Sequence, residues 1–109
     1  MIQDTINEFR KENNKPPVSF WDRILSDHCL WHTFEMVKRG NIFHSEEFYR
    51  PGYGEIVACG LFEDNIENSL KRLIYNLQGE HKEALLNWSH IGYAYFIDKG
   101  RIYLTIRGK

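Results

Sequence analysis

The stretch HIGYAYFIDKGRIYLTIR, residues 90–107, decides the fold class. In its two halves, 90–97 and 101–107, the type of side chain alternates from one residue to the next, which is the pattern of a half-buried β-strand. Asp98, Lys99 and Gly100 separate the halves. The sequence therefore predicts an antiparallel hairpin with a three-residue loop, in which Gly100 takes the left-handed conformation. A sheet that starts this way needs helices from elsewhere in the chain to cover it.

Two helices are predicted before the hairpin. Apolar residues at helical spacing indicate a short helix over 2–12, which a pair of prolines then prevents from continuing. The longest helix is predicted over 20–39, opened by a capping box of Ser19 and Asp22. Apolar residues surround so much of this helix that we expect it to be mostly buried.

The middle of the chain supplies the remaining elements. Residues 41–54 form an irregular, aromatic-rich segment, and loops of this length are often functional. A short strand is predicted over 55–60 and a helix over 65–78, with Asp64 as its cap. A brief helical turn follows at 81–87. The order of elements predicts one α+β domain over 1–109, with helices packed on a short, mainly antiparallel three-stranded sheet.

Composition and charge narrow the function classes. The chain has 109 residues, of which 42% are hydrophobic and 15% aromatic, as expected for one packed core. A net charge of −1 argues against nucleic acid as a partner. We expect the basic residues Arg101, Arg107 and Lys109 to lie on a solvated strand face. No apolar run is long enough for a transmembrane segment, and the N-terminal residues lack a signal-peptide pattern.

The two cysteines do not make a disulfide framework. Cys29 lies in an apolar helical stretch and Cys59 in a strand-like one, which favours a pair of free, buried thiols. A single bridge between them is the alternative.

An ordered set of fragments along nearly the whole chain resembles the CAP superfamily, which includes cysteine-rich secretory proteins, antigen 5 and pathogenesis-related proteins. The fragments are Asn7…Arg10…Pro16-Pro17…Trp21-Asp22…Leu25, similar to N-x-x-R followed by PPL-x-W-D-x-x-L; His32…Met36, similar to H-x-x-x-M; His44 with GEIVACG at 54–60, similar to H…G-E-N-I-A-x-G; GEHKEALL at 79–86, similar to G-H-R-x-x-L-L; and Ile91-Gly92-Tyr93, similar to I-G-V-G. The resemblance implies an α-β-α sandwich around a short antiparallel sheet. It also implies an extracellular or cell-surface location, although this chain shows no signal peptide.

The same resemblance implies a cleft in which two histidines and two acids can hold a divalent metal. The first histidine of that set is His44, the first acid is Glu55, and the second histidine is His81. Gln78 is the nearest counterpart of the second acid.

Imidazole and carboxylate groups are suitable ligands for Zn²⁺ and similar divalent metals. His44, His81 and Glu55 would give three ligands and an open position, the general form of a catalytic zinc site. In a separate arrangement Glu55 is the candidate catalytic base, acting on a water held by His44 and His81. The alternative is a hydrogen-bonded polar cluster that orders the 41–54 segment against the helix predicted over 65–78.

Two further groups of side chains permit more than one interpretation. His28 and His32 have the i, i+4 spacing that can place two imidazoles on one metal, but their apolar surroundings favour core or boundary histidines with hydrogen-bond partners. Four rings of the 41–54 segment either line a ligand pocket or simply keep the segment folded; these rings are Phe43, Phe48, Tyr49 and Tyr53.

Three functions are compatible with these residues. The first is a non-enzymatic binding module for an ion, a small ligand, a lipid or a protein. The second is a metal-dependent hydrolase that uses Glu55 as general base. The third is a structural interaction domain without a ligand site.

Overall fold

The C-terminal hairpin forms the centre of a four-stranded sheet. A computed structural model describes residues 1–46 and 52–109. Strands β3 (His90–Asp98) and β4 (Arg101–Gly108) pair antiparallel, and β2 (Gly54–Leu61) pairs antiparallel with the other edge of β4. A fourth strand that the sequence did not predict, β1 (Phe20–Trp21), lies parallel to β3, which gives the order β1-β3-β4-β2.

The hairpin loop has two residues where the sequence predicted three. Asp98 belongs to β3 and faces Arg101 in the register, so only Lys99 and Gly100 lie between the strands. Their φ values are 49° and 77°, and positive φ at both positions is the mark of a type I′ turn. This turn is favoured because its twist matches that of the paired strands, which lets pairing continue through Asp98.

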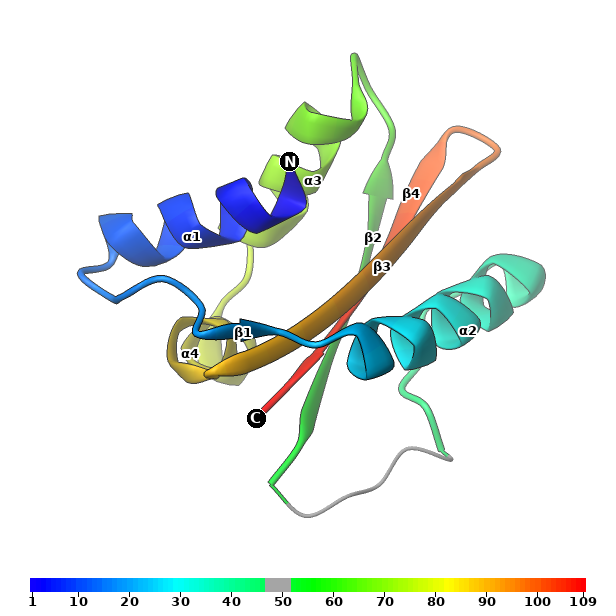
Figure 1. Ribbon diagram of the computed structural model, residues 1–109. Helices are drawn as coiled ribbons and strands as arrows, with labels where there is room; N and C mark the ends of the chain where they lie inside the picture. The colour runs from blue at the N-terminus through cyan, green and yellow to red at the C-terminus, as the bar shows by residue number, and fades with distance from the viewer. Residues whose placement is uncertain (47–51) are drawn as a thin grey trace.

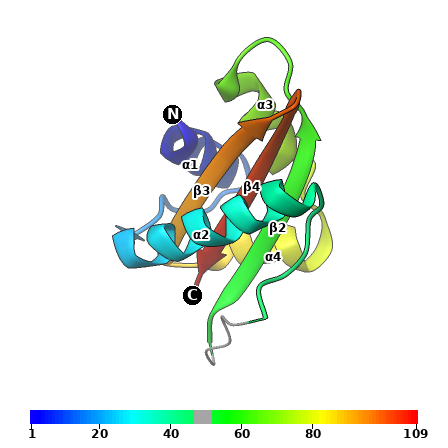
Figure 2. The same cartoon turned by 90° about the vertical axis from the view of Figure 1, so that its right-hand side faces the viewer.

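Helices cover both faces of the sheet, as the predicted α-β-α sandwich requires (Figure 1). Helix α2 (Arg23–Arg39) lies across one face. Three helices lie on the opposite face, and in Figure 2 they stand behind the sheet with α2 in front of it; these helices are α1 (Ile2–Glu12), α3 (Ile66–Tyr75) and α4 (Gly79–Asn87).

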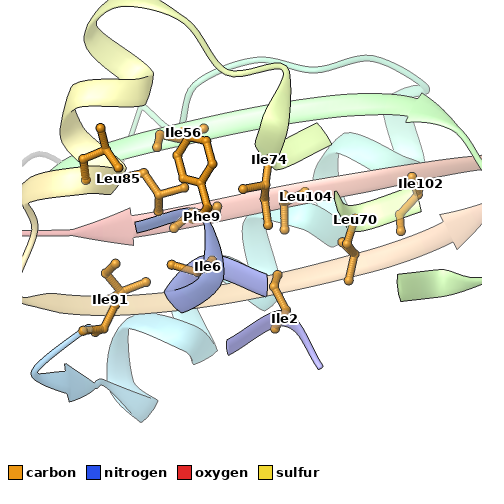
Figure 3. Close-up of a cluster of buried hydrophobic side chains, with 13 residues drawn as sticks. Ile2, Ile6, Phe9, Ile56, Leu70, Ile74, Leu85, Ile91, Ile102 and Leu104 are labelled. Atoms are coloured by element: carbon orange, nitrogen blue, oxygen red, sulfur yellow. The ribbon is translucent and has the colours of Figure 1, made fainter. Parts of the chain in front are cut away.

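The main core lies between the sheet and the three-helix layer. Its side chains come from every element of that layer and from one face of the strands, as Figure 3 shows for Ile2, Ile6, Phe9, Ile56, Leu70, Ile74, Leu85, Ile91, Ile102 and Leu104. In β4 the alternate residues Tyr103, Thr105 and Arg107 are buried as well. Strand β4 is therefore covered on both faces, which is why α2 contacts mixed polar and apolar residues of the sheet.

The long helix begins three residues later than predicted. Asp22 is itself the N-cap, and its carboxylate accepts hydrogen bonds from the backbone N–H groups of Ile24 and Leu25 at 2.9 and 3.1 Å. The backbone N–H groups of Phe20 and Asp22 donate to the carbonyls of Ser89 and Ile91. Pairing with β3 thus takes Phe20 and Trp21 into the sheet and overrides the predicted Ser19–Asp22 capping box.

Helix α2 is also less buried than its composition indicated. One face packs on the sheet through Leu25, Cys29, His32, Thr33 and Met36. The opposite face exposes four large apolar side chains, which are Ile24, Leu30, Trp31 and Phe34. The prediction was wrong because α2 is the outermost layer, and none of the described residues forms a further layer over it.

The third helix is shorter than predicted and the fourth longer. Asn65, not Asp64, caps α3, since its side chain accepts a hydrogen bond from the N–H of Asn68 at 2.8 Å. Asp64 has a φ of 63° and belongs to the preceding turn. Helix α3 ends at Tyr75, and α4 is a helix of nine residues where only a turn was expected. None of the helices among the described residues combines the length and hydropathy needed to cross a bilayer.

Both thiols are free, as the sequence favoured, but the prediction that both are buried was wrong for Cys59. Cys29 is fully buried, and burial raises its pKa to about 12 despite the nearby charge of Arg107. Cys59 is partly exposed and lines a small pocket that also contains Ile42 and Arg101.

We therefore expect one thiol to react in the folded protein. Ellman's reagent at pH 8 should modify Cys59 within minutes and Cys29 only after denaturant is added, because the reacting species is an accessible thiolate. The variant C59S should show no rapid reaction. Rapid reaction of two thiols in the native wild-type protein would contradict the burial of Cys29.

Candidate functional site

An open cleft lies between α2 and the segment 43–46. Its volume is about 670 Å³, which is within the usual range for small-molecule sites. The lining combines imidazoles, rings and charged groups from parts of the chain far apart in sequence, namely His28, Trp31, His32, Glu35, Arg39, Phe43, His44, Ser45, Glu46 and Arg107.

The carboxylate of Glu55 holds the inner wall of this cleft in place through hydrogen bonds. Its side chain is only 10% exposed and carries a hydrogen bond on each oxygen. Oε2 accepts from Nε of Arg107 at 2.7 Å, and Arg107 lies directly opposite Glu55 in the β2–β4 register. Oε1 accepts from the backbone N–H of Ser45 at 2.8 Å and from Nδ1 of His44 at 3.1 Å. The carboxylate therefore joins the sheet to the segment that carries His44.

These contacts determine the charge state of Glu55. Burial alone would raise the pKa of its carboxyl. The hydrogen bonds from Ser45, Arg107 and His44, with the positive charge of Arg107, outweigh burial and hold the pKa below its ordinary value. Glu55 is therefore ionised at neutral pH and is a weak base.

His32 of α2 also holds the segment 43–46 in place, through a hydrogen bond to Phe43. Its ring is buried, and Nε2 donates to the backbone carbonyl of Phe43 at 2.6 Å. The same nitrogen is 3.9 Å from Oε1 of Glu55. The rings of Phe43 and His32 meet edge to face at 5.0 Å, and the Arg39 guanidinium lies 4.6 Å from the Phe43 ring centroid. His32 is thus a boundary histidine with hydrogen-bond partners, as its surroundings indicated.

The structure brings His44, Glu55 and His81 to one place. The ring centroids of His44 and His81 are 6.3 Å apart, and His44 reaches Glu55 directly. Both imidazoles are exposed, whereas the carboxylate lies beneath them. Gln78 is the exposed N-cap residue of α4, one turn before His81.

The donor set does not fit a metal ion as the side chains stand. Within residues 1–46 and 52–109, no three His, Cys, Asp or Glu side chains form a group that could hold a metal. Both oxygens of Glu55 already accept hydrogen bonds, and the Arg107 guanidinium is 2.7 Å from one of them. A cation placed on this carboxylate would meet the positive charge of Arg107.

Arg107 belongs to the site, although the sequence did not predict it there. The sequence predicted a solvated strand face, but Arg107 is 2% exposed. The prediction failed because β4 is buried on both faces and because Glu55 supplies a counter-charge inside. The sequence pattern that could have located Arg107 is the alternation of residues 101–107. It places Arg107 on the same strand face as Thr105 and opposite the core isoleucines.

The aromatic residues of the predicted loop have separate positions. Phe43 lines the cleft, whereas Tyr53 packs under the Lys109 ammonium group, 4.9 Å from its ring centroid. Phe48 and Tyr49 lie outside the described residues. Trp31 of α2, which is 71% exposed, stands at the rim of the cleft.

Comparison with known proteins identifies the fold. No family model and no curated protein matches the sequence. An outer surface protein from Borrelia burgdorferi is similar over 99% of this chain and 89% of that chain, with 21% identity and a TM-score of 0.72. The venom allergen-like protein 4 of Schistosoma mansoni is similar over 97% of this chain and 86% of that chain, with 14% identity and a TM-score of 0.60.

The second of these structures belongs to the CAP superfamily, whose motifs this chain resembles. At such identities the likeness concerns the fold alone. The two helical layers, the central sheet and these structural neighbours together give one conclusion: the chain has a CAP-like fold.

Proposed function

We propose that this chain is a non-enzymatic binding module whose ligand occupies the cleft between α2 and residues 43–46. The observation that carries the proposal is the cleft itself, about 670 Å³ of open space with imidazole, aromatic and charged groups along its walls. Apolar rings beside a few oriented polar groups are the usual composition of a small-ligand site. The buried Glu55–Arg107 pair supports the proposal because it would keep the wall in place before a ligand arrives.

The ligand that fits this lining is a small organic molecule with a flat ring and an ionisable group. Trp31 and Phe43 offer ring surfaces, and His44 offers a side chain that is 59% exposed. Arg39 and Glu35 on α2 offer charges of both signs.

A hydrolase fits the same residues less well. A general base must be free to take up a proton near neutral pH. Glu55 instead has a lowered pKa and accepts hydrogen bonds on both oxygens. We therefore assign Glu55 the task of positioning His44 and Ser45.

Nuclear magnetic resonance titration tests the proposal. Fragments that combine an aromatic ring with a carboxylate or an amine should shift the Trp31 indole signal and the amide signals of residues 43–46. The variant H44A should weaken binding several-fold, because it removes the imidazole that the cleft offers to the ligand. It should leave the fold intact, because His44 is exposed. H90A is the matched control, since His90 lies on β3 outside the cleft lining.

Two outcomes would change the assignment. If no fragment shifts these signals at millimolar concentration, the cleft is not a binding site and the structural alternative is favoured. Zn²⁺ is a separate probe. Joint shifts of the His44 and His81 ring signals on its addition would transfer the proposal to the divalent metal that the resemblance implies.

A further inference from the structure

The outer edge of β2 borders a groove that is separate from the cleft. Strand β2 is the last strand of the sheet (Figure 2), and no described residue makes a backbone hydrogen bond to its outer edge. Beside this edge lies a pocket with a volume of about 310 Å³. We call it the β2 groove; it is lined by residues 40–42 after α2, residues 59–61 of β2, and Arg101 of β4.

The backbone of Cys59 and Leu61 is directed toward the outer edge. The N–H of Phe62 donates to the carbonyl of Gly100 at 2.8 Å, so the backbone of Phe62 faces β4. Along an antiparallel strand the residues that bond the partner strand alternate with those that face away from it. Gly60 therefore faces β4 as well, whereas the N–H and carbonyl groups of Cys59 and Leu61 face outward, beside the groove.

This edge lacks the features that usually prevent further strand pairing. Exposed edge strands are commonly protected by proline, by lysine or by a β-bulge. Residues 57–61, VACGL, contain neither proline nor a charged residue. The register with β4 runs from Gly54 to Leu61 without a bulge. The outer edge of β2 is therefore able to accept another strand.

We propose that the β2 groove binds an extended peptide segment of another protein, which joins the sheet as an antiparallel strand beside β2 and places an acidic side chain opposite Leu61. An extended backbone is required because it alone matches the N–H and carbonyl groups of Cys59 and Leu61 at their two-residue spacing. Antiparallel pairing is the more stable of the two possible directions.

Arg101 provides the charge that selects an acidic segment. Arg101 lies directly opposite Leu61 in the β2–β4 register, and paired residues share one face of the sheet. A side chain placed opposite Leu61 on the added strand would share that face too. Arg101 is exposed, lines the groove, and forms no ion pair within residues 1–46 and 52–109. Its guanidinium is therefore available to a carboxylate of the partner.

Ile42 indicates the second side chain of the partner. The residue opposite Cys59 would lie in the groove beside Cys59 and Ile42, and the side chain of Ile42 is 40% exposed. Covering Ile42 favours an apolar side chain at that position. In the antiparallel direction the residue opposite Leu61 comes first, so the expected pattern is an acidic residue followed two positions later by an apolar one.

A second copy of this chain does not supply the acidic group. If two β2 edges pair with Ala58 facing Ala58, Glu55 of one copy lies opposite Leu61 of the other. The Glu55 carboxylate, however, is already held by Arg107 and Ser45 and is not free for Arg101. The inference rests on the β2 groove alone and does not depend on the ligand proposed for the cleft.

Nuclear magnetic resonance titration with the blocked pentapeptide TETVT tests the proposal. The peptide should shift the amide signals of Cys59 and Leu61, and at saturation it should slow the reaction of Cys59 with Ellman's reagent several-fold. TKTVT, with lysine in place of the acid, should bind about fivefold more weakly. TETVT that is methylated on the valine nitrogen should bind about tenfold more weakly, because this N–H is the donor to the Cys59 carbonyl.

Variants of the protein test the role of the charge. R101E should bind TETVT about fivefold more weakly than wild type and should prefer TKTVT. K99E is the matched control, because Lys99 is exposed in the hairpin turn and lies outside the groove lining. It carries the same change of charge and should leave the affinity for TETVT nearly unchanged.

Several results would overturn the proposal. One is the absence of shifts at Cys59 and Leu61 at millimolar TETVT. Undiminished binding of the methylated peptide would exclude strand pairing, and equal losses in R101E and K99E would exclude a specific contact with Arg101. Shifts confined to Trp31 and residues 43–46 would place the peptide in the cleft instead. Dimerisation that shifts the Cys59 and Leu61 signals without peptide would assign the edge to a second copy.

Discussion

Replacing Arg107 with methionine should lower the free energy of unfolding by about 3–5 kcal/mol at neutral pH. The change removes the guanidinium but retains most of the side-chain length. It leaves the Glu55 carboxylate, which is 10% exposed, without the partner on its Oε2 atom. The cost arises from this uncompensated buried charge more than from the lost attraction. Urea denaturation followed by circular dichroism measures it.

A loss of stability this large is expected only for the buried Glu55–Arg107 pair. Arg101→Met on the same strand should change stability by less than about 0.5 kcal/mol, because Arg101 is exposed. The double variant E55M/R107M should be more stable than either single variant, since neither charge then remains buried alone. Strictly additive losses in this cycle would contradict a direct coupling between the two side chains.

The loss in R107M should also depend on pH. In the wild-type protein the folded pKa of Glu55 is lowered, so its contribution to stability is present at neutral pH and disappears as pH falls through that pKa. Without Arg107, the hydrogen bond and the positive charge that help to lower this pKa are lost, so less of the variant's stability depends on the ionised carboxylate. The stability gap between wild type and R107M should therefore narrow between pH 7 and pH 3. A constant gap would show that the lost stability is not tied to the charge of Glu55.

The meeting of His44, Glu55 and His81 could be anticipated only from the ordered family resemblance. Their separations in sequence are too large for a local pattern, and only the packing of α4 and the 43–46 segment against β2 brings them together. The partner of Glu55 was not predictable in this way. Strands β2 and β4 pair although 39 residues lie between them, so no turn fixes their register. Arg107 consequently looked like one more exposed basic residue near the C-terminus.

Local signals failed where tertiary pairing competes with them. Ser19 and Asp22 satisfy the spacing of a capping box, yet Phe20 and Trp21 gain hydrogen bonds and packing by joining β3. In α2 the residue types did not reveal which face is covered. A helix with apolar residues all around reads as buried, but a single sheet can cover only one face. The exposed Ile24 and Trp31 are the result.

The second large effect is expected at Gly92, where α2 rests on the sheet. Gly92→Ala should lower the free energy of unfolding by about 3 kcal/mol, at the upper end for overpacking. A Cβ atom at this position would lie 2.4 Å from Cβ of Leu25 and 2.4 Å from the backbone nitrogen of Ser26. Backbone atoms cannot move aside as a flexible side chain can, so the first turn of α2 must shift as a unit.

That shift would reach the proposed binding cleft. The first turn of α2 is attached to β3 by the hydrogen bond from the N–H of Tyr93 to Oγ of Ser26 at 3.1 Å, and by the Asp22 N–H bond to the Ile91 carbonyl at 2.8 Å. Displacement of the helix carries with it Trp31 and His32, which line the cleft. We therefore expect G92A to lose cleft binding together with stability.

Gly60→Ala is the matched control for Gly92→Ala. A Cβ atom at Gly60 would meet only the side chain of Leu73, with Cδ2 at 2.9 Å and Cγ at 3.9 Å, and the end of a leucine side chain can rotate away. G60A should therefore cost less than about 1 kcal/mol and leave cleft binding unchanged. Equal losses in G92A and G60A would mean that glycine in these strands is required for its backbone alone. A loss confined to G92A would establish that the contact between α2 and β3 sets the position of the helix on which the proposed cleft depends.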